Sequence, residues 1–140
     1  MKHQKLRHSF EVEDVAGIIR MTYADRVEFH DGDAELAPGI TLHATGGHSA
    51  GLQCVRVNTE RGQVVLASDV SHFYENMETG RGFTTLFHLG AMLDGFCTLR
   101  ALAPSANHII PGHDPEVMRR YPAVPGLEGI AVELHREPVP

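Results

Sequence analysis

The chain has 140 residues, of which 42% are hydrophobic and 21% charged, a composition that suits one compact globular domain. Its formal net charge of −6 argues against a nucleic-acid partner, because phosphate binding needs a basic face. No apolar run approaches the length of a membrane span, and the N-terminus has no apolar signal-peptide core. We therefore expect a cytoplasmic protein without membrane contact.

The first third of the chain predicts short strands. Residues 1–22 mix charge with short apolar groups, and we interpret them as a leader that feeds a first strand around 11–21. Alternating apolar and polar residues then indicate two further strand segments, 26–30 and 41–45. Asp31-Gly32-Asp33 between them is typical of a turn.

A hairpin is predicted next. Residues 52–59 and 63–68 have strand patterns, and Glu60-Arg61-Gly62 joins them. The second segment is almost continuously apolar, which predicts a strand buried on both faces.

Helices follow. Residues 71–83 indicate a short helix and a mobile loop. Residues 88–103 place apolar side chains at helical spacing, and Pro104 ends the run. Residues 107–110 then predict a brief strand.

Near the C-terminus, Asp114 is expected to cap a short helix that starts at Pro115 and reaches Tyr121. A loop rich in proline and glycine follows, and 130–135 alternates as a final strand. The order of elements, strands first and then helices alternating with short strands, predicts a layered α/β fold with helices packed outside the sheet.

Two residue types carry the candidate chemistry. Cys54 and Cys97 lie in apolar patterns, and we interpret both as reduced thiols in the core. The chain also contains ten histidines, an unusual number, and histidine is the commonest transition-metal ligand. Some of these histidines are therefore candidate metal ligands.

Three predicted strands are each followed by a potential metal ligand, namely His48, Asp69 and His113. Side chains at strand ends can converge at one edge of a sheet, and two imidazoles with a carboxylate suit zinc. The glycines before the two histidines would let backbone approach a metal closely. A turn residue at His48 and helix caps at the other two positions explain the same residues without a metal, so spacing alone leaves both readings open.

The sequence motifs around these residues are more specific. GGHSAGLQ, LASDVSHFYEN and IIPGHDP, with PGIT before the first, resemble the later motifs of the metallo-β-lactamase fold. More narrowly, they resemble the N-acyl homoserine lactonase branch, from about residue 10 to 121. The resemblance implies an α/β fold equivalent to the C-terminal half of an αββα sandwich, with 1–140 forming one partial domain.

The resemblance also implies roles for the three residues. His48 corresponds to a histidine on the first of two metals, Asp69 to a carboxylate that bridges both metals, and His113 to a histidine on the second. In such enzymes a hydroxide between two zinc ions attacks the carbonyl of a lactone. The implied function is a metal-dependent hydrolase that opens a lactone or similar ester.

The sequence departs from this pattern in one respect that concerns the metals. The motif His-x-His-x-Asp-His, which supplies most of the metal ligands in intact relatives, does not occur in the 140 residues. We therefore expect one zinc ion or none, and interpret the chain as the C-terminal half of a lactonase-like protein. Apolar faces left uncovered would favour self-association or a complementing chain.

A second departure concerns the substrate. Similar lactonases often have a tyrosine three residues after the bridging aspartate, whereas this chain has His72 there and Tyr74 two residues later. Either side chain is a candidate to hydrogen-bond the substrate carbonyl, and a surface position explains each equally well.

The other histidines and nearby apolar residues receive structural interpretations. We expect surface or local roles for a set of seven: His3, His8, His30, His43, His88, His108 and His135. Phe83, Phe87 and Met92 are candidates for an acyl-chain pocket, but helical spacing favours core packing.

Three functional hypotheses remain. The first is a lactonase-type metal-dependent hydrolase that acts on a small-molecule lactone or ester. The second is a catalytically silent, truncated domain that serves as a binding or assembly partner. The third is a protein that holds a single metal with His48, Asp69 and His113 alone.

Overall fold

The computed structural model describes residues 4, 7 and 10–139. The predictions for His3 and His8 therefore lie outside the described residues. The chain forms two compact units, Met1–His30 and Asp31–Pro140. No helix among the described residues combines the length and apolar character that crossing a membrane requires.

The first unit contains a helix where a strand was predicted. α1 spans Val12–Tyr23, so the prediction of a strand around 11–21 was wrong. Val12, Val15 and Ile19 recur at helical spacing and line one apolar groove. Acidic residues in the first turn and Arg20 in the last also favour a helix, because they complement its dipole.

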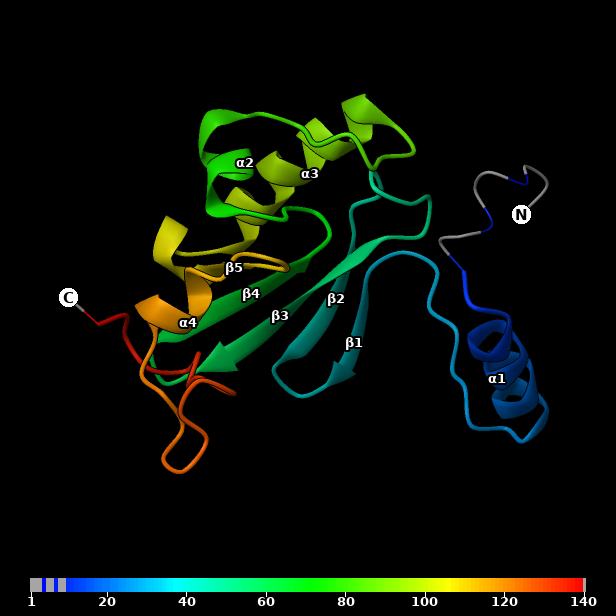
Figure 1. Ribbon diagram of the computed structural model, residues 1–140, viewed down its shortest axis with the longest axis horizontal. Coiled ribbons are helices and arrows are strands. Elements are labelled where there is room, and N and C mark those ends of the chain that lie inside the picture. The colour runs from blue at the N-terminus through cyan, green and yellow to red at the C-terminus, as the bar shows by residue number, and fades with distance from the viewer. Residues whose placement is uncertain (1–3, 5–6, 8–9, 140) are drawn as a thin grey trace. The chain divides into compact units, whose positions relative to one another are not determined.

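The second unit is built on a five-stranded sheet in the order β1-β2-β3-β4-β5 (Figure 1). Its strands are β1 (Ala34–Ala37), β2 (Ile40–Ala44), β3 (Gln53–Thr59), β4 (Gly62–Ser68) and β5 (Ile109–Pro111). β1 to β4 pair antiparallel, whereas β4 and β5 pair parallel. The prediction for 26–30 was wrong, since no strand forms there.

The predicted hairpin is confirmed as the β3–β4 pair. Gly62 starts β4 with a φ of +110°, a conformation that side chains rarely adopt. Val64 and Val65, adjacent residues that point to opposite faces, are both almost fully buried. The burial of β4 on both faces is therefore confirmed.

Two helices cover one face of the sheet, α2 (Tyr74–Thr79) and α3 (Leu89–Leu102), as predicted (Figure 1). Met92 and Phe96 of α3 pack in one core cluster with Cys54 of β3. Burial raises the pKa of the Cys54 thiol to about 11. The core position predicted for Cys97 was wrong: this residue is exposed, because it lies one helical step beyond the buried Phe96.

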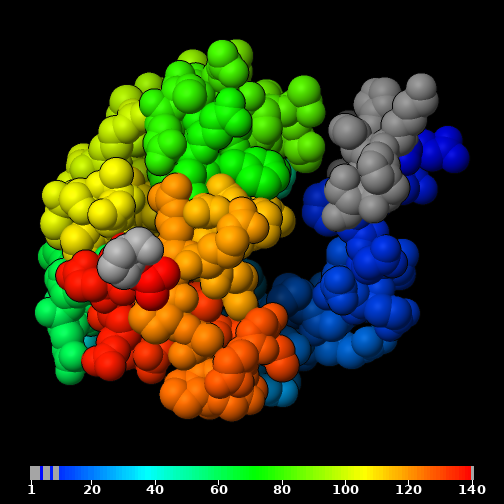
Figure 2. Space-filling model, turned by 60° about the vertical axis from the view of Figure 1, so that its left-hand side comes forward, coloured from blue at the N-terminus to red at the C-terminus, as the bar shows by residue number. Residues whose placement is uncertain are grey.

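The C-terminal segment covers part of the opposite face. The 3₁₀ helix η2 (Ala106–His108) precedes β5, and α4 spans Val117–Arg120, where a short helix was predicted. Tyr121 packs against Val64 and Ile110 in a second core cluster. Figure 2 shows the segment after β5, in orange to red, gathered over one side of this unit.

The predicted strand at 130–135 was wrong. Only an isolated bridge between Ala123 and Val132 forms there. The Arg61 side chain donates to the Leu134 carbonyl at 2.8 Å, and Glu133 N donates to the Pro122 carbonyl at 2.8 Å. The backbone groups of this segment are thus satisfied by irregular contacts rather than by a strand ladder.

Candidate metal centre

The sheet topology brings three strand ends to one edge. β2 and β4 are both antiparallel to β3, and β5 is parallel to β4. These three strands therefore run in the same direction, and their carboxyl ends share an edge of the sheet. Asp69 follows β4 directly, His113 comes two residues after β5, and His48 comes four residues after β2.

Two of the three predicted metal ligands meet at this edge. His113 Nε2 lies 2.7 Å from Asp69 Oδ1. His72 joins them, with its Nε2 at 3.1 Å from the same carboxylate oxygen. One ligand atom from each of the three side chains lies within 4.8 Å of the other two. The structure thus gathers a carboxylate and two imidazoles around one point.

The backbone fixes these side chains through two neighbouring loops. Gly112 N donates to the Ser71 carbonyl at 3.0 Å, and His113 N donates to the His72 carbonyl at 2.9 Å. In Figure 2, green atoms from the region around α2 lie beside orange atoms of the segment that follows β5. A Cβ on Gly112 would lie 2.6 Å from the Ser68 carbonyl oxygen, so this approach requires glycine.

Strain accompanies this junction. Ser68 has a φ of +51°, a left-handed conformation that is uncommon for residues other than glycine. It is the last residue of β4 and directly precedes Asp69. Such conformations persist where surrounding contacts hold them, and they concentrate at functional sites.

His72 is held in a largely apolar setting. Its ring stacks on Phe83 with centroids 3.7 Å apart and planes 15° apart. Burial, followed by the nearby His113, lowers the pKa of His72 below its ordinary value of 6.5. Its buried Nε2 lies 3.1 Å from Asp69 Oδ1 without the geometry of a hydrogen bond.

His48 lies next to this group. Its Nδ1 donates to the Thr85 carbonyl at 2.7 Å, and its ring centroid is 5.6 Å from that of His72. With Nδ1 protonated, Nε2 carries the free lone pair, which is the arrangement of metal-binding histidines. The preceding Gly47 has a φ of +91°, and a Cβ there would lie 2.6 Å from Met92 Cα. Gly46 and Gly47 therefore let the chain approach α3 closely, and His48 follows them directly.

Tyr74, the other candidate donor to a substrate carbonyl, is the first residue of α2, and its side chain is buried in the core. Its hydroxyl has no hydrogen-bond partner among the described residues, and Arg120 lies over its ring at 3.8 Å. Burial raises the pKa of this hydroxyl above its ordinary value of 10. Its backbone N donates to Asp114 Oδ2 at 3.0 Å, and Asp114 Oδ1 also accepts from Glu116 N. The cap predicted at Asp114 was wrong, because α4 starts at Val117 and Glu116 is its N-cap residue.

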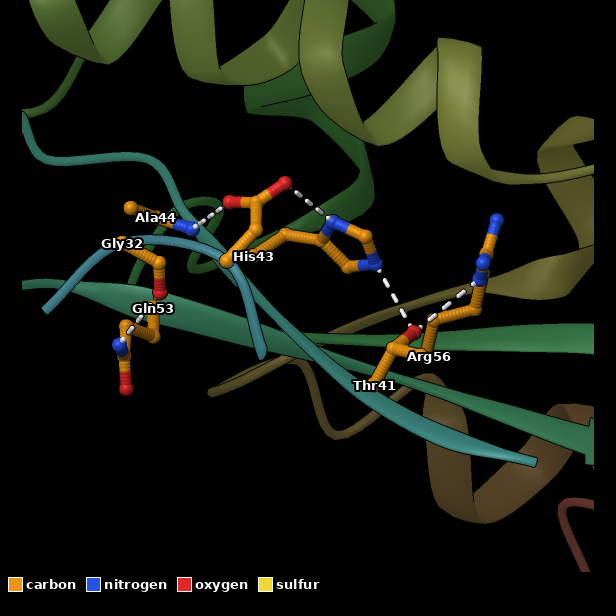
Figure 3. Close-up of polar contacts among 7 residues, drawn as sticks. Gly32, Thr41, His43, Ala44, Gln53 and Arg56 are labelled. Atoms are coloured by element: carbon orange, nitrogen blue, oxygen red, sulfur yellow. Dashed lines mark hydrogen bonds and ion pairs between the residues drawn. The ribbon is translucent and has the colours of Figure 1, made fainter. Parts of the chain in front are cut away.

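Another histidine organises a separate polar network on β2 (Figure 3). Asp33 accepts hydrogen bonds from Ala44 N at 2.9 Å and from His43 Nδ1 at 3.0 Å. His43 Nε2 then lies 2.9 Å from Thr41 Oγ1, which also accepts from Arg56 Nε at 3.3 Å. The local structural role predicted for His43 is confirmed, whereas its partner Asp33 was missed because it lies ten residues away across a turn.

Local roles are also confirmed for two further histidines. The His88 side chain accepts from Ala91 N at the start of α3, and His108 lies 2.9 Å from both Ser105 Oγ and the Arg61 carbonyl. The expected core packing is confirmed for Met92 but wrong for Phe87, which is 70% exposed. The stacking of Phe83 on His72 has no signal in the sequence, because the helix α2 and a turn separate the two residues.

The donor set fits a divalent transition metal. Zinc binds imidazole and carboxylate ligands, and both are present at Asp69, His72 and His113. The unpartnered Nε2 of His72 and the tautomer of His48 also fit, since each leaves a lone pair available. Sequence reasoning assigned His48 to the metal and His72 to the substrate, whereas the structure places His72 in the tight group.

The fold and this edge define a class: an α/β protein with a partial metallo-β-lactamase sandwich. It resembles a quorum-quenching N-acyl homoserine lactone hydrolase at 34% identity, with a TM-score of 0.58, over 64% of this chain and 38% of that chain. It also resembles B. thuringiensis AiiA, in a mutant with N-decanoyl-L-homoserine bound at the active site, at 32% identity with a TM-score of 0.62. That match covers 70% of this chain and 40% of that chain.

A third structure shares the fold alone. AidC, a dizinc quorum-quenching lactonase, matches at 14% identity with a TM-score of 0.59, over 81% of this chain and 39% of that chain. No family model matches the chain, and no curated protein does. The chain is thus a lactonase-like relative with the metallo-β-lactamase fold, and it spans about two fifths of the length of these structures.

Proposed function

We propose that this chain contributes to a metal-dependent hydrolase centre that opens a lactone or similar ester. The observation that carries the proposal is the convergence of Asp69 and His113 at the shared edge of β2, β4 and β5. The support from relatives is that structures 32–34% identical to this chain are N-acyl homoserine lactone hydrolases. In one of them the product N-hexanoyl-L-homoserine lies at the catalytic metal centre.

The proposed roles follow the chemistry of the side chains. Asp69 and His113 hold the metal between them, and His48 lies in the adjoining loop with its Nδ1 bonded to the Thr85 carbonyl. When bound, the metal supplies Lewis acidity for the ester carbonyl and lowers the pKa of water. Without a metal, the 2.7 Å contact with Asp69 Oδ1 keeps His113 oriented. For Tyr74, the role of carbonyl donor requires its buried hydroxyl to become accessible.

We also propose that further protein covers the exposed sheet face. On the face opposite α2 and α3, the C-terminal segment packs on Val64 and Ile110, but several apolar residues of this face are only half-buried: Ile40, Val55, Val57 and Leu66. A second copy of the chain or a complementing chain would remove this surface from water. The oligomeric state measured by light scattering tests this part of the proposal: a monomer that binds no other chain contradicts it.

A catalytically silent binding partner is the competing function. The observation in its favour is that the 140 residues contain no His-x-His-x-Asp-His sequence. In that case the Asp69 group would stabilise the fold or an assembly rather than perform catalysis.

Lactone hydrolysis and metal content, measured on the same preparation, separate these functions. The hydrolase predicts bound metal and a hydrolysis rate above buffer, abolished in Asp69→Ala. An Asp94→Ala variant, which removes an exposed carboxylate from α3, is the matched control and should retain the rate. Bound metal without any hydrolysis favours the silent partner.

A further inference from the structure

We infer that Asp69, His72 and His113 form a three-ligand site for one zinc-like ion, complete within this chain. This goes beyond the proposed function, because it concerns ion binding whether or not the chain hydrolyses an ester. It also gives His72 a new role, since in similar lactonases this position is often a tyrosine.

The distances favour a shared ion. Two ligands of a tetrahedral zinc, each about 2.0–2.1 Å from the metal, lie roughly 3.3 Å apart. His72 Nε2 is 3.1 Å from Asp69 Oδ1, and His113 Nε2 is 2.7 Å from the same atom. Small movements of the side chains therefore convert these contacts into metal–ligand bonds. Water fills the fourth position of such a site.

His72 is already arranged as a ligand. Phe83 stacks on its ring, so the orientation of the imidazole is fixed before an ion arrives. Its buried Nε2 lies 3.1 Å from Asp69 Oδ1 without the geometry of a hydrogen bond, and a buried polar atom in that position is costly. The bond from His113 N to the His72 carbonyl couples the two imidazole ligands. A metal ion would satisfy the unused nitrogen.

His48 stands outside this set. Among the described residues, only Asp69, His72 and His113 have ligand atoms that all lie within 4.8 Å of one another. The Thr85 carbonyl holds His48 through its Nδ1 in a different loop. An ion at Asp69 is therefore bound by residues of the β4 and β5 ends alone.

Zinc titration of the metal-free 140-residue chain tests the inference. We expect one equivalent to bind, and His72→Asn to weaken the affinity by at least about 10-fold. His72→Tyr, which introduces the residue of similar lactonases, should weaken it comparably. His135→Asn removes an exposed histidine as the matched control and should leave the affinity unchanged. Circular dichroism verifies that each variant folds.

A second measurement needs no mutation. NMR spectra can correlate the carbon-bound protons of the histidine rings with the ring nitrogens. In these spectra, one equivalent of zinc should shift the Nε2 resonances of His72 and His113. A shift at His48 in place of His72, or an equal loss of affinity in His48→Asn and His72→Asn, overturns the assignment. Absence of stoichiometric binding overturns it as well. One bound zinc without lactone hydrolysis leaves the inference standing and rejects the hydrolase for this chain.

Discussion

His113 Nε2 contacts Asp69 Oδ1 at 2.7 Å although the two residues are 44 positions apart. The contact exists because β4 and β5 pair in parallel, which brings the residues after both strands to one edge of the sheet. A parallel pair needs a long crossover, and here α2 and α3 provide it while covering the sheet. The elements that form the core therefore also assemble the candidate site.

The glycine before His113 should be indispensable for this geometry. In Gly112→Ala the new Cβ would lie 2.6 Å from the Ser68 carbonyl oxygen, so one of the two loops must move. We expect the free energy of unfolding to fall by about 1–3 kcal/mol, and zinc affinity to fall with it. Gly51→Ala is the matched control, because a Cβ there meets nothing within 4 Å. Urea denaturation of both variants measures the difference, and equal stability would contradict the close-approach argument.

Phe83 should matter for the metal more than for the fold. Phe83→Leu removes the ring that stacks on His72 at 3.7 Å and leaves the imidazole free to rotate. We expect zinc affinity to drop by roughly 10-fold, as for other groups that orient a metal ligand. Phe87→Leu changes an exposed ring and should leave zinc affinity unaltered. Calorimetric titration compares the two, and an unchanged affinity in Phe83→Leu would show that the stacking does not orient His72.

Removing the Tyr74 hydroxyl distinguishes a buried group without a function from a hydrogen-bond donor to the substrate carbonyl. The hydroxyl is buried and without a hydrogen bond among the described residues, so Tyr74→Phe should leave the free energy of unfolding unchanged or raise it by up to about 1 kcal/mol. A donor to the substrate carbonyl would instead lower kcat without a change in stability. Thermal unfolding and lactone hydrolysis of the variant distinguish these outcomes. A lower free energy of unfolding in Tyr74→Phe would mean that the hydroxyl forms a hydrogen bond in the folded protein.

Acid should weaken the network around Asp33. The Ala44 amide and then His43 lower the pKa of Asp33 below its ordinary value of 3.8 (Figure 3). A carboxylate whose pKa is lower in the folded state contributes stability that is complete above 3.8 and is lost as the pH falls through the folded pKa. The stability difference between wild type and Asp33→Asn should therefore shrink progressively below that pH. Urea denaturation across the acid range measures it, with Asp31→Asn as the control for a charge lost from the same turn.

Arg61 should anchor the C-terminal segment. Its guanidinium donates to the carbonyls of Leu134 and Asn107 and to the Tyr121 hydroxyl, and it also lies over the Tyr121 ring. Arg61→Ala should lower the free energy of unfolding by about 2 kcal/mol or more and make the chain after Tyr121 sensitive to protease. Arg136→Ala removes an exposed arginine with one long ion pair and should change stability by less than about 0.5 kcal/mol. Equal protease sensitivity in the two variants would contradict the anchoring role.

Predictions from local sequence patterns were confirmed where interactions between residues close in the sequence determine the structure. The β3–β4 hairpin followed from alternation and a glycine turn, and α3 followed from apolar spacing that ends at Pro104. The strand predicted around 11–21 failed because β-branched residues obscured a helical stripe. The strand predicted at 130–135 failed because a distant arginine, Arg61, takes the backbone carbonyl that a strand would need.

The sequence by itself determined that potential ligands follow three strands, because residue type and strand pattern are local properties. Its motifs also pointed to the lactonases that the comparisons then matched. Only the tertiary structure decided which ligands meet. The parallel pairing of β4 with β5 joins Asp69 to His113, and the loop that carries Phe83 turns the His72 ring toward them. The first contact spans 44 positions and the second spans the helix α2. Both depend on packing, so no local pattern encodes them.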